Sequence, residues 1–193
     1  MKLSRRRLPD IIIETDRFVI RNIRPWRFAR QTVGWSRDVE MMVNMGWGTA
    51  ERSLYDWWRL LRKLERGDRR CLGIWARGET RPIGLRWIQH YSRANVGMLN
   101  ALIGDKSWRG RGAYAETTKA TIDYWFSNTG VERLYAQTRQ TNAAVIHTLE
   151  RLGFRHEGTL RSHAMTSDGT RIDMIQFGLL RGEWLARRKG ARE

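Results

Sequence analysis

An apolar run and the basic, glycine-rich turn behind it occupy the middle of the chain, with the sequence Val96-Gly97-Met98-Leu99-Asn100-Ala101-Leu102-Ile103-Gly104-Asp105-Lys106-Ser107-Trp108-Arg109-Gly110-Arg111-Gly112-Ala113. The apolar part predicts a β-strand over residues 96–103. Beyond the turn, inward-facing residues recur at helical spacing, so a helix is expected to follow. A strand that passes through a tight turn into a helix is typical of mixed α and β domains.

The turn itself, Ser107 to Ala113, has the chemistry of an anion site. Its glycines lack Cβ atoms, so a ligand can approach the main chain closely. The unpaired N–H groups and the dipole of the helix start attract negative charge. Arg109 and Arg111 add positive charge that suits phosphates, so the predicted guest is a pyrophosphate.

Several classes of phosphate loop could use such a turn. A P-loop is excluded, because the chain contains no Gly-x-x-x-x-Gly-Lys-Ser/Thr. Gly110-x-Gly112-x-x-Ala115 matches a variant dinucleotide fingerprint, but six residues separate Ile103 from Gly110, and Glu132 stands at the start of the next strand rather than at its end. The pyrophosphate loop of an acyl-coenzyme A enzyme fits better, and an ordinary glycine turn stays open.

Strand-like and helix-like segments alternate on both sides of this unit. Further strands are expected over residues 17–23, 70–76, 82–91, 133–138, 154–160 and 172–180. Further helices are expected from Pro25 towards Trp35, over residues 54–64, and from the cap Asn142 to Gly153. The pattern predicts one α/β (α+β) domain over residues 1–193, with short basic tails at about 1–10 and 186–193.

Composition limits the cellular setting and the partners. The formal net charge of +16 favours acidic partners such as phosphates, nucleotides or nucleic acid. The single cysteine, Cys71, allows no disulfide within the chain and is expected to be a buried small hydrophobe. No apolar stretch is long enough for a signal peptide or a membrane span, so a soluble, cytoplasmic protein is expected.

Four motifs in order resemble the GNAT acetyltransferases, especially the branch that acetylates the N-termini of ribosomal proteins. They are Glu14 to Arg21, Ile103 to Gly112, Asn142 followed by Leu149-Glu150-Arg151-Leu152-Gly153-Phe154, and a closing segment with Glu157 to Arg161, Asp173, Leu180, Glu183 and Trp184. The resemblance covers roughly residues 14–184. It implies a mixed, mostly antiparallel split sheet of six to seven strands flanked by about four helices.

The resemblance also implies acetyl-coenzyme A as cosubstrate. Its pantetheine arm would lie in the split and bond the backbone of Leu102 and Ile103, with Asn142 beside it. The pyrophosphate would lie on the residues Arg109, Gly110, Arg111, Gly112, Ala113 and Tyr114.

The catalytic positions depart from the family pattern. Residues 96–103 contain no carboxylate, and Leu149 and Val145 stand where relatives often have tyrosine and serine. Positioning alone can supply much of the rate, about 7–11 kcal/mol at best. Otherwise another side chain or a water moves the proton, and the candidate side chains are His163 and His90. No pair of histidines has metal-ligand spacing, so no metal is expected.

These observations support an N-acetyltransferase that acts by direct transfer in a ternary complex. The acceptor would be a protein N-terminus or a small amine such as an amino sugar or amino acid, and the charge favours an acidic or phosphate-bearing one. No membrane partner is expected, and the oligomeric state is monomer or homodimer. The alternative is a catalytically degenerate GNAT-fold protein that binds nucleic acid or another polyanion.

Overall fold

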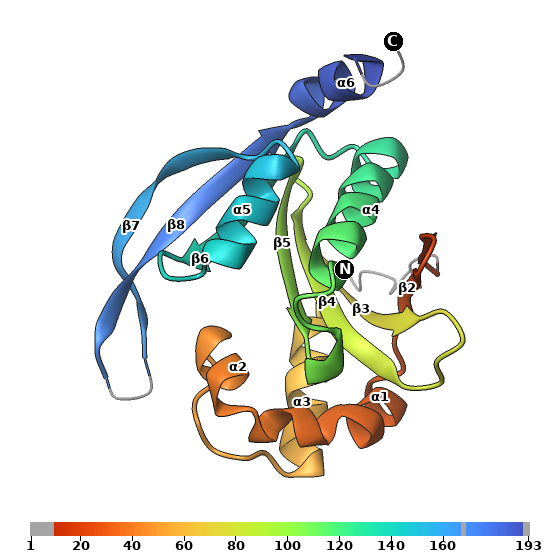
Figure 1. Cartoon of the computed structure of the whole chain (residues 1–193), viewed down its shortest axis with the longest axis vertical. Coiled ribbons are helices and arrows are strands. Elements are labelled where there is room, and N and C mark those ends of the chain that lie inside the picture. The colour runs from red at the N-terminus through yellow and green to blue at the C-terminus, as the bar shows by residue number, and fades with distance from the viewer. Residues whose placement is uncertain (1–9, 167–168, 191–193) are drawn as a thin grey trace, which may run out of the picture.

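The computed structural model describes residues 10–166 and 169–190. Within these residues the chain forms eight β-strands, six α-helices and two 3₁₀ helices (Figure 1). The strands are β1 (Ile12–Glu14), β2 (Phe18–Asn22), β3 (Arg69–Ala76), β4 (Pro82–Tyr91), β5 (Val96–Ile103), β6 (Arg133–Arg139), β7 (Arg155–Met165) and β8 (Arg171–Leu180). The helices are α1 (Pro25–Thr32), η1 (Val33–Arg37), α2 (Val39–Asn44), α3 (Leu54–Leu64), η2 (Lys106–Trp108), α4 (Ala113–Asn128), α5 (Ala143–Arg151) and α6 (Arg181–Gly190).

All eight strands belong to one sheet, in the order β1-β2-β3-β4-β5-β6-β8-β7. Neighbouring strands run antiparallel except for β5 and β6, which are parallel. A parallel pair needs a crossover connection, and α4 supplies it. The glycine-rich turn therefore lies between the end of β5 and the start of this crossover helix.

The sheet is split between β5 and β6. Their pairing covers three residue pairs, which end at Met98 and Tyr135. Both strands continue past that point, β5 to Ile103 and β6 to Arg139. Figure 1 shows the β7–β8 hairpin swinging away from β5 on the far side of this split.

Helices cover both faces of the sheet, and the period-two alternation of the strands separates two cores. Leu72 and Ile74 belong to the core that includes α4 and α5 residues such as Ile122 and Leu149. The alternate strand residues Cys71, Leu85 and Trp87 belong to the second core, which α1, α2 and α3 complete.

The prediction of a mostly antiparallel, split α/β sheet is confirmed, but the strand count was too low. The extra strand is β1, whose three residues pair with β2. Ile11 and Ile13 are buried while Ile12 is 61% exposed, which is the alternation of a sheet-edge strand. Three residues are too few for a periodic signal, so the sequence pattern predicts no strand here.

The expected four helices are present, but α2 and α6 were missed. Helix α2 has six residues, and the side chain of Asp38 caps it by accepting from the Met41 N–H. Residues 186–190, which were predicted as part of a basic tail, are exposed and lie in α6. Trp184 anchors α6 by donating from Nε1 to Asp123 Oδ1 at 2.7 Å, a contact that the local sequence does not reveal. The tail predicted over residues 1–10 lies outside the described residues except for Asp10.

Among the helices that the structure describes, none combines the length and apolar character that a bilayer crossing requires.

Candidate cofactor and acyl-transfer site

The turn after β5 uses two glycines in the left-handed region. Gly110 has φ of +71° and Gly112 has φ of +78°, a conformation that residues with a Cβ rarely adopt. Gly112 is the N-cap of α4, and no side chain caps the helix there. The main chain can therefore turn sharply and present its N–H groups at an uncapped helix start.

These N–H groups form the candidate anion site. The first helical bond of α4 runs from the Glu116 N–H to the Gly112 carbonyl at 3.0 Å. The N–H groups of Ala113, Tyr114 and Ala115 precede it and have no helical acceptor. Because they converge where the helix dipole is positive, a phosphate is their natural partner.

Arg109 fixes the position of the loop through bonds to the end of β5 and to the start of α2. Its Nε donates to the Ile103 carbonyl at 2.9 Å, and its Nη1 lies 2.7 Å from Asp38 Oδ2. Burial acts to raise the pKa of Asp38, but the Met41 N–H and the Arg109 guanidinium outweigh it and lower this pKa. In the structure the Arg109 guanidinium thus holds the loop to α2 and to the end of β5.

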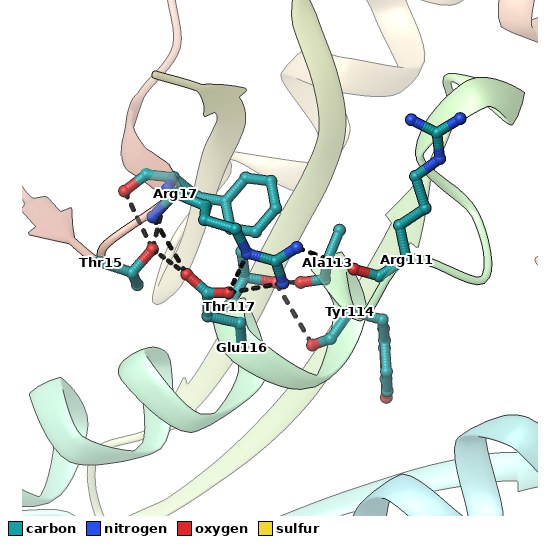
Figure 2. Close-up of polar contacts among 8 residues, drawn as sticks. Thr15, Arg17, Arg111, Ala113, Tyr114, Glu116 and Thr117 are labelled. Carbon is teal, nitrogen blue, oxygen red and sulfur yellow. Dashed lines mark hydrogen bonds and ion pairs between the residues drawn. The ribbon is translucent and has the colours of Figure 1, made fainter.

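A second brace comes from the segment between β1 and β2 (Figure 2). Arg17 donates from Nε to Glu116 Oε2 at 2.7 Å and from Nη1 to the Arg111 carbonyl at 3.0 Å. Thr15 Oγ1 donates to the other oxygen of Glu116 at 2.7 Å. Burial acts to raise the pKa of Glu116, but the bonds from Thr15 and Arg17 outweigh it and lower this pKa.

The positive charge of Arg17 lies against the glycine-rich turn. A Cβ on Gly112 would lie 3.2 Å from Arg17 Nη2, so the guanidinium is in contact with the turn. Arg111 extends away from the pair in Figure 2, and within the described residues its guanidinium forms no hydrogen bond or ion pair. Arg17 and Arg111 are thus two cations at this turn that retain exposed surface. The local sequence gives no sign of this role for Arg17, because Glu116 lies 99 residues away along the chain.

The edge of β5 that faces the split has unused backbone groups. The Gly104 N–H donates to the Ile83 carbonyl at 2.9 Å, which makes Gly84 and Ile103 a non-hydrogen-bonded pair of the antiparallel ladder. The N–H and carbonyl of Ile103 therefore point away from β4. The bond that Ile103 accepts from Arg109 fits this direction.

The alternation of the ladder also fixes the direction in which the backbone groups of the neighbouring residues point. Backbone groups of Ala101 and Ile103 and the carbonyl of Leu99 face the split, whereas the backbone groups of Leu102 face Leu85 on β4. The side chain of Leu102 is buried in the core under α1 to α3. The split thus offers an extended backbone edge that leads from the glycine-rich turn towards Met98.

Asn142 lies on the other side of the split, just beyond β6. Its N–H donates to the Arg139 carbonyl at 3.0 Å, and its Oδ1 accepts from the Val145 N–H at 3.3 Å. The side chain therefore caps α5, as the sequence predicts. The two helix starts, of α4 and α5, lie at the open ends of β5 and β6.

Two tyrosines mark the closed end of the split. Tyr135 pairs with Met98 at the last joined position, and its hydroxyl lies 3.5 Å from the hydroxyl of Tyr91. Burial, followed by the nearby Tyr91, raises the pKa of Tyr135 to about 12. The Tyr135 phenol therefore stays protonated at neutral pH and can donate a proton, but it is a poor base.

A polar network continues along β6 from Tyr135. Gln137 donates to Gln176 Oε1 at 3.0 Å, Gln176 donates to Glu157 Oε2 at 3.2 Å, and Arg133 forms an ion pair with the same carboxylate. The half-buried β6 residues alternate with buried ones, and this period-two pattern predicts a strand but no function for these polar side chains.

Comparison with models of known protein families shows which family the chain belongs to. A model described as an acetyltransferase (GNAT) domain matches residues 17–155. The chain belongs to the GNAT acetyltransferase family. Among curated proteins, it is 32% identical over 96 residues to the uncharacterized N-acetyltransferase p20 of Bacillus licheniformis, a match that covers 50% of this chain and 51% of that protein. The chain spans about half the length of the curated relatives it matches.

Solved structures show the same GNAT fold. A ribosomal-protein-S5-alanine acetyltransferase from Vibrio fischeri is 19% identical with a TM-score of 0.75, and the match covers 91% of this chain and 99% of that one. A spermidine N-acetyltransferase from Vibrio cholerae, solved with CoA and spermine, is 17% identical with a TM-score of 0.78, and the match covers 89% and 99%. At these identities the likeness shows the fold alone.

The two candidate histidines lie apart in this GNAT domain. His163 is exposed on β7, and β8 and β6 separate it from the split. His90 pairs with Gly97, where β5 and β6 are still joined. Its Nε2 is buried and has no hydrogen-bond partner among the described residues. A catalytic role for either histidine stays a prediction.

The remaining candidate groups of this GNAT domain concern metal and thiol chemistry. Among residues 10–166 and 169–190, no group of three or more His, Cys, Asp or Glu side chains could hold a metal ion. Cys71 is buried, as predicted, and burial raises the pKa of its thiol well above the usual value. The thiol is therefore unsuited to act as a nucleophile.

Proposed function

We propose that this chain is an acetyl-coenzyme A-dependent N-acetyltransferase that acetylates a primary amine by direct transfer in a ternary complex. One observation carries the proposal: the free N–H groups of the α4 start adjoin an unpaired β5 edge. A diphosphate suits the first, and an amide-bearing pantetheine arm suits the second, because it can add to the edge as another strand does. Family membership and the CoA complex of a structural neighbour support this pairing.

The proposed contacts follow from the geometry. The N–H groups of Ala113, Tyr114 and Ala115 hold the diphosphate, with Arg17 and Arg111 nearby. Backbone groups of Ala101 and Ile103 hold the arm. Arg109 and Asn142 act mainly by fixing the loop and the α5 start, since their side chains are already bonded within the protein.

The transfer itself needs two proton movements. The amine nitrogen forms a bond to the thioester carbon while the carbon–sulfur bond breaks. The amine loses a proton, and the departing thiolate gains one. We assign the second role to Tyr135, because its protonated phenol lies at the closed end of the split, where an arm laid along β5 from the turn would end. Holding amine and thioester together supplies the rest of the rate.

Charge narrows the choice of acceptor. A chain with net charge +16 repels a polycation such as a polyamine and attracts an acidic acceptor. We therefore favour an acceptor that carries carboxylates or phosphates beside its amine, either a small molecule or an acidic protein N-terminus. One form of this proposal is that the chain belongs to the GNAT branch that acetylates the N-termini of ribosomal proteins.

Isothermal titration with acetyl-coenzyme A tests the binding step, and release of CoA thiol with a panel of amines tests transfer. The expected result is saturable binding and thiol release that depends on one class of amine. Absence of binding at millimolar acetyl-coenzyme A would sink the proposal.

A second candidate function rests on a basic cavity beside α1. This cavity, of about 620 Å³, is lined by Arg21, Arg24, Arg27 and Arg30, and the part of the chain that the structure describes contributes no acidic side chain to its lining. Such a surface suits a polyanion, so the alternative is a GNAT-fold protein that binds nucleic acid. Its affinity for RNA should fall steeply with salt, and replacing two of these arginines should flatten that slope. Acetyl transfer without salt-sensitive RNA binding would reject this alternative.

A further inference from the structure

A buried arginine lies beneath the first turns of α4. Arg86 is on β4, between Leu72 of β3 and Ala101 of β5, and it is 1% exposed. Its side chain faces α4, because Leu72 belongs to the core that α4 covers. Placing a charged guanidinium in such surroundings is unfavourable unless an opposite charge compensates it.

The structure provides Arg86 with no such charge. Its Nη2 donates to the Thr118 hydroxyl at 2.7 Å and to the Thr117 hydroxyl at 3.4 Å. Its Nε has no acceptor, and no carboxylate of the described residues forms an ion pair with it. Burial lowers the pKa of Arg86 to about 10, so the guanidinium still carries its charge at neutral pH.

The neighbouring phenol does not neutralise this charge. Burial raises the pKa of Tyr114, and the nearby Arg86 offsets only part of that effect. The Tyr114 side chain is therefore neutral at physiological pH. Among residues 10–166 and 169–190, therefore, no ionised group supplies a counter-charge for Arg86.

The threonines connect Arg86 to the free N–H groups of the α4 start. Thr118 Oγ1 donates to the Tyr114 carbonyl at 2.6 Å, and Thr117 Oγ1 donates to the Ala113 carbonyl at 2.7 Å. Ala113, Tyr114 and Thr117 can be followed in Figure 2. Each carbonyl shares a peptide unit with the next N–H, so these bonds act on the N–H groups of Tyr114 and Ala115. Chains of hydrogen bonds polarise one another, and a charge at one end strengthens donation at the other.

We propose that Arg86 is a positioning residue for the cofactor diphosphate: a buried cation that acts through Thr117 and Thr118 and is neutralised when the diphosphate binds at the α4 start. The inference rests on the proposed cofactor. Without ligand, Arg86, the helix dipole and the nearby arginines repel one another. Binding of a dianion relieves that repulsion and converts an unfavourable burial into affinity.

Calorimetric titration of Arg86→Met with CoA and with pantetheine, which lacks the diphosphate, tests the proposal. We expect affinity for CoA to fall about tenfold and affinity for pantetheine to stay unchanged. Arg86→Lys keeps the charge and should restore most of the CoA affinity. Thr118→Val removes the shorter of the two links from Arg86 to the α4 start and should weaken CoA binding in the same direction.

Arg70→Met is the matched control, because it also removes one arginine from the sheet. Arg70 is partly buried and lies on β3, where it pairs with Ile88 of β4. This variant should leave the CoA affinity unchanged. The melting temperature of unliganded Arg86→Met separates the roles: it should match or exceed that of the wild type, whereas a purely structural arginine would lower it.

The outcomes are distinguishable. A wild-type protein that binds no CoA overturns the proposed function and this inference with it. A wild type that binds CoA, with Arg86→Met equal to it or with CoA and pantetheine weakened alike, overturns only the inference. If Arg86→Met does not fold, the CoA affinities of Thr118→Val and Arg86→Lys test the inference. Weaker binding by Thr118→Val than by Arg86→Lys supports it, and equal binding by the two variants overturns it.

Discussion

At the scale of single residues, the site depends on side chains that hold the loop rather than on side chains that await a ligand. Glu116 and Arg17 join α4 to the start of β2, and Asp38 and Arg109 join α2 to the end of β5. These two ion pairs brace opposite sides of the same turn. In the proposed function, the diphosphate site is therefore formed before any ligand arrives, which reduces the ordering cost of binding.

The Glu116 brace predicts a pH-dependent stability. The folded protein lowers the pKa of Glu116, so its contribution is present above the unfolded value of about 4.3 and is lost as pH falls through the folded pKa. We expect Glu116→Gln to lose about 1 kcal/mol at pH 7 and less at pH 3. Urea unfolding at both pH values measures this. Glu14→Gln, which breaks the exposed pair with Arg77, is the control and should change little at either pH; an equal loss at both pH values for Glu116→Gln contradicts the argument.

Tyr135 predicts a separation of catalysis from binding. Tyr135→Phe removes only the hydroxyl, so we expect kcat to fall about a hundredfold, as for loss of a general acid, while the KM for acetyl-coenzyme A stays unchanged. Steady-state kinetics measures both. Tyr55→Phe, on an exposed tyrosine of α3, is the control. An unchanged kcat would assign the proton to water.

At the scale of elements, the edge of β5 is the feature that matters. Along this strand, the backbone groups of every second residue form hydrogen bonds with β4. The backbone groups of the residues between them face the split. An unpaired edge is ordinarily a risk for unwanted strand pairing. Here it adjoins an anion site at one end and Tyr135 at the other, which suits an extended ligand.

Proline substitutions distinguish the two kinds of position. Ala101→Pro removes an N–H that faces the split, so the protein should fold and its affinity for CoA should fall about three- to tenfold. Leu102→Pro removes an N–H that bonds β4 and should lower stability by several kcal/mol. Titration calorimetry and thermal unfolding measure the two effects. The assignment of the edge would be wrong if the two variants exchanged these results.

At the scale of the whole molecule, the net charge of +16 acts over distances that no single contact covers. A positive field raises the encounter rate with acidic acceptors and lowers it with cationic ones, and salt screens both effects. The cavity lined by arginines beside α1 is one concentration of this field.

The charge predicts a salt-dependent choice of acceptor. At low salt, kcat/KM for an acidic peptide should exceed that for a basic peptide of equal length by at least about tenfold, and the ratio should shrink as salt rises. Parallel assays at two salt concentrations check this. A ratio that does not change with salt would place selectivity in short-range contacts instead.

Much of the fold and part of the site could be predicted from the sequence because they depend on local patterns. Period-two and helical spacing located seven strands and four helices. The strand β1 and the helices α2 and α6 were missed, since β1 and α2 are short and α6 is held by Trp184 and Asp123 across 61 residues. In the site, the glycine-rich turn was predicted from neighbouring residues, whereas Arg17, Tyr135 and Arg86 were not.

The sequence by itself determined which chemistry the turn offers, because Gly110, Gly112 and the start of α4 are adjacent in the chain and their backbone conformation is a local property. Only the tertiary structure decided where the charges and backbone groups point. It turned Arg109 back towards Asp38, brought Arg17 to Glu116, and buried Arg86 under Thr117 and Thr118. It also set the ladder register that leaves Ala101 and Ile103 facing the split while Leu102 bonds β4. Register and ion pairing join residues far apart in the chain, and they form only when the packed core brings those residues together.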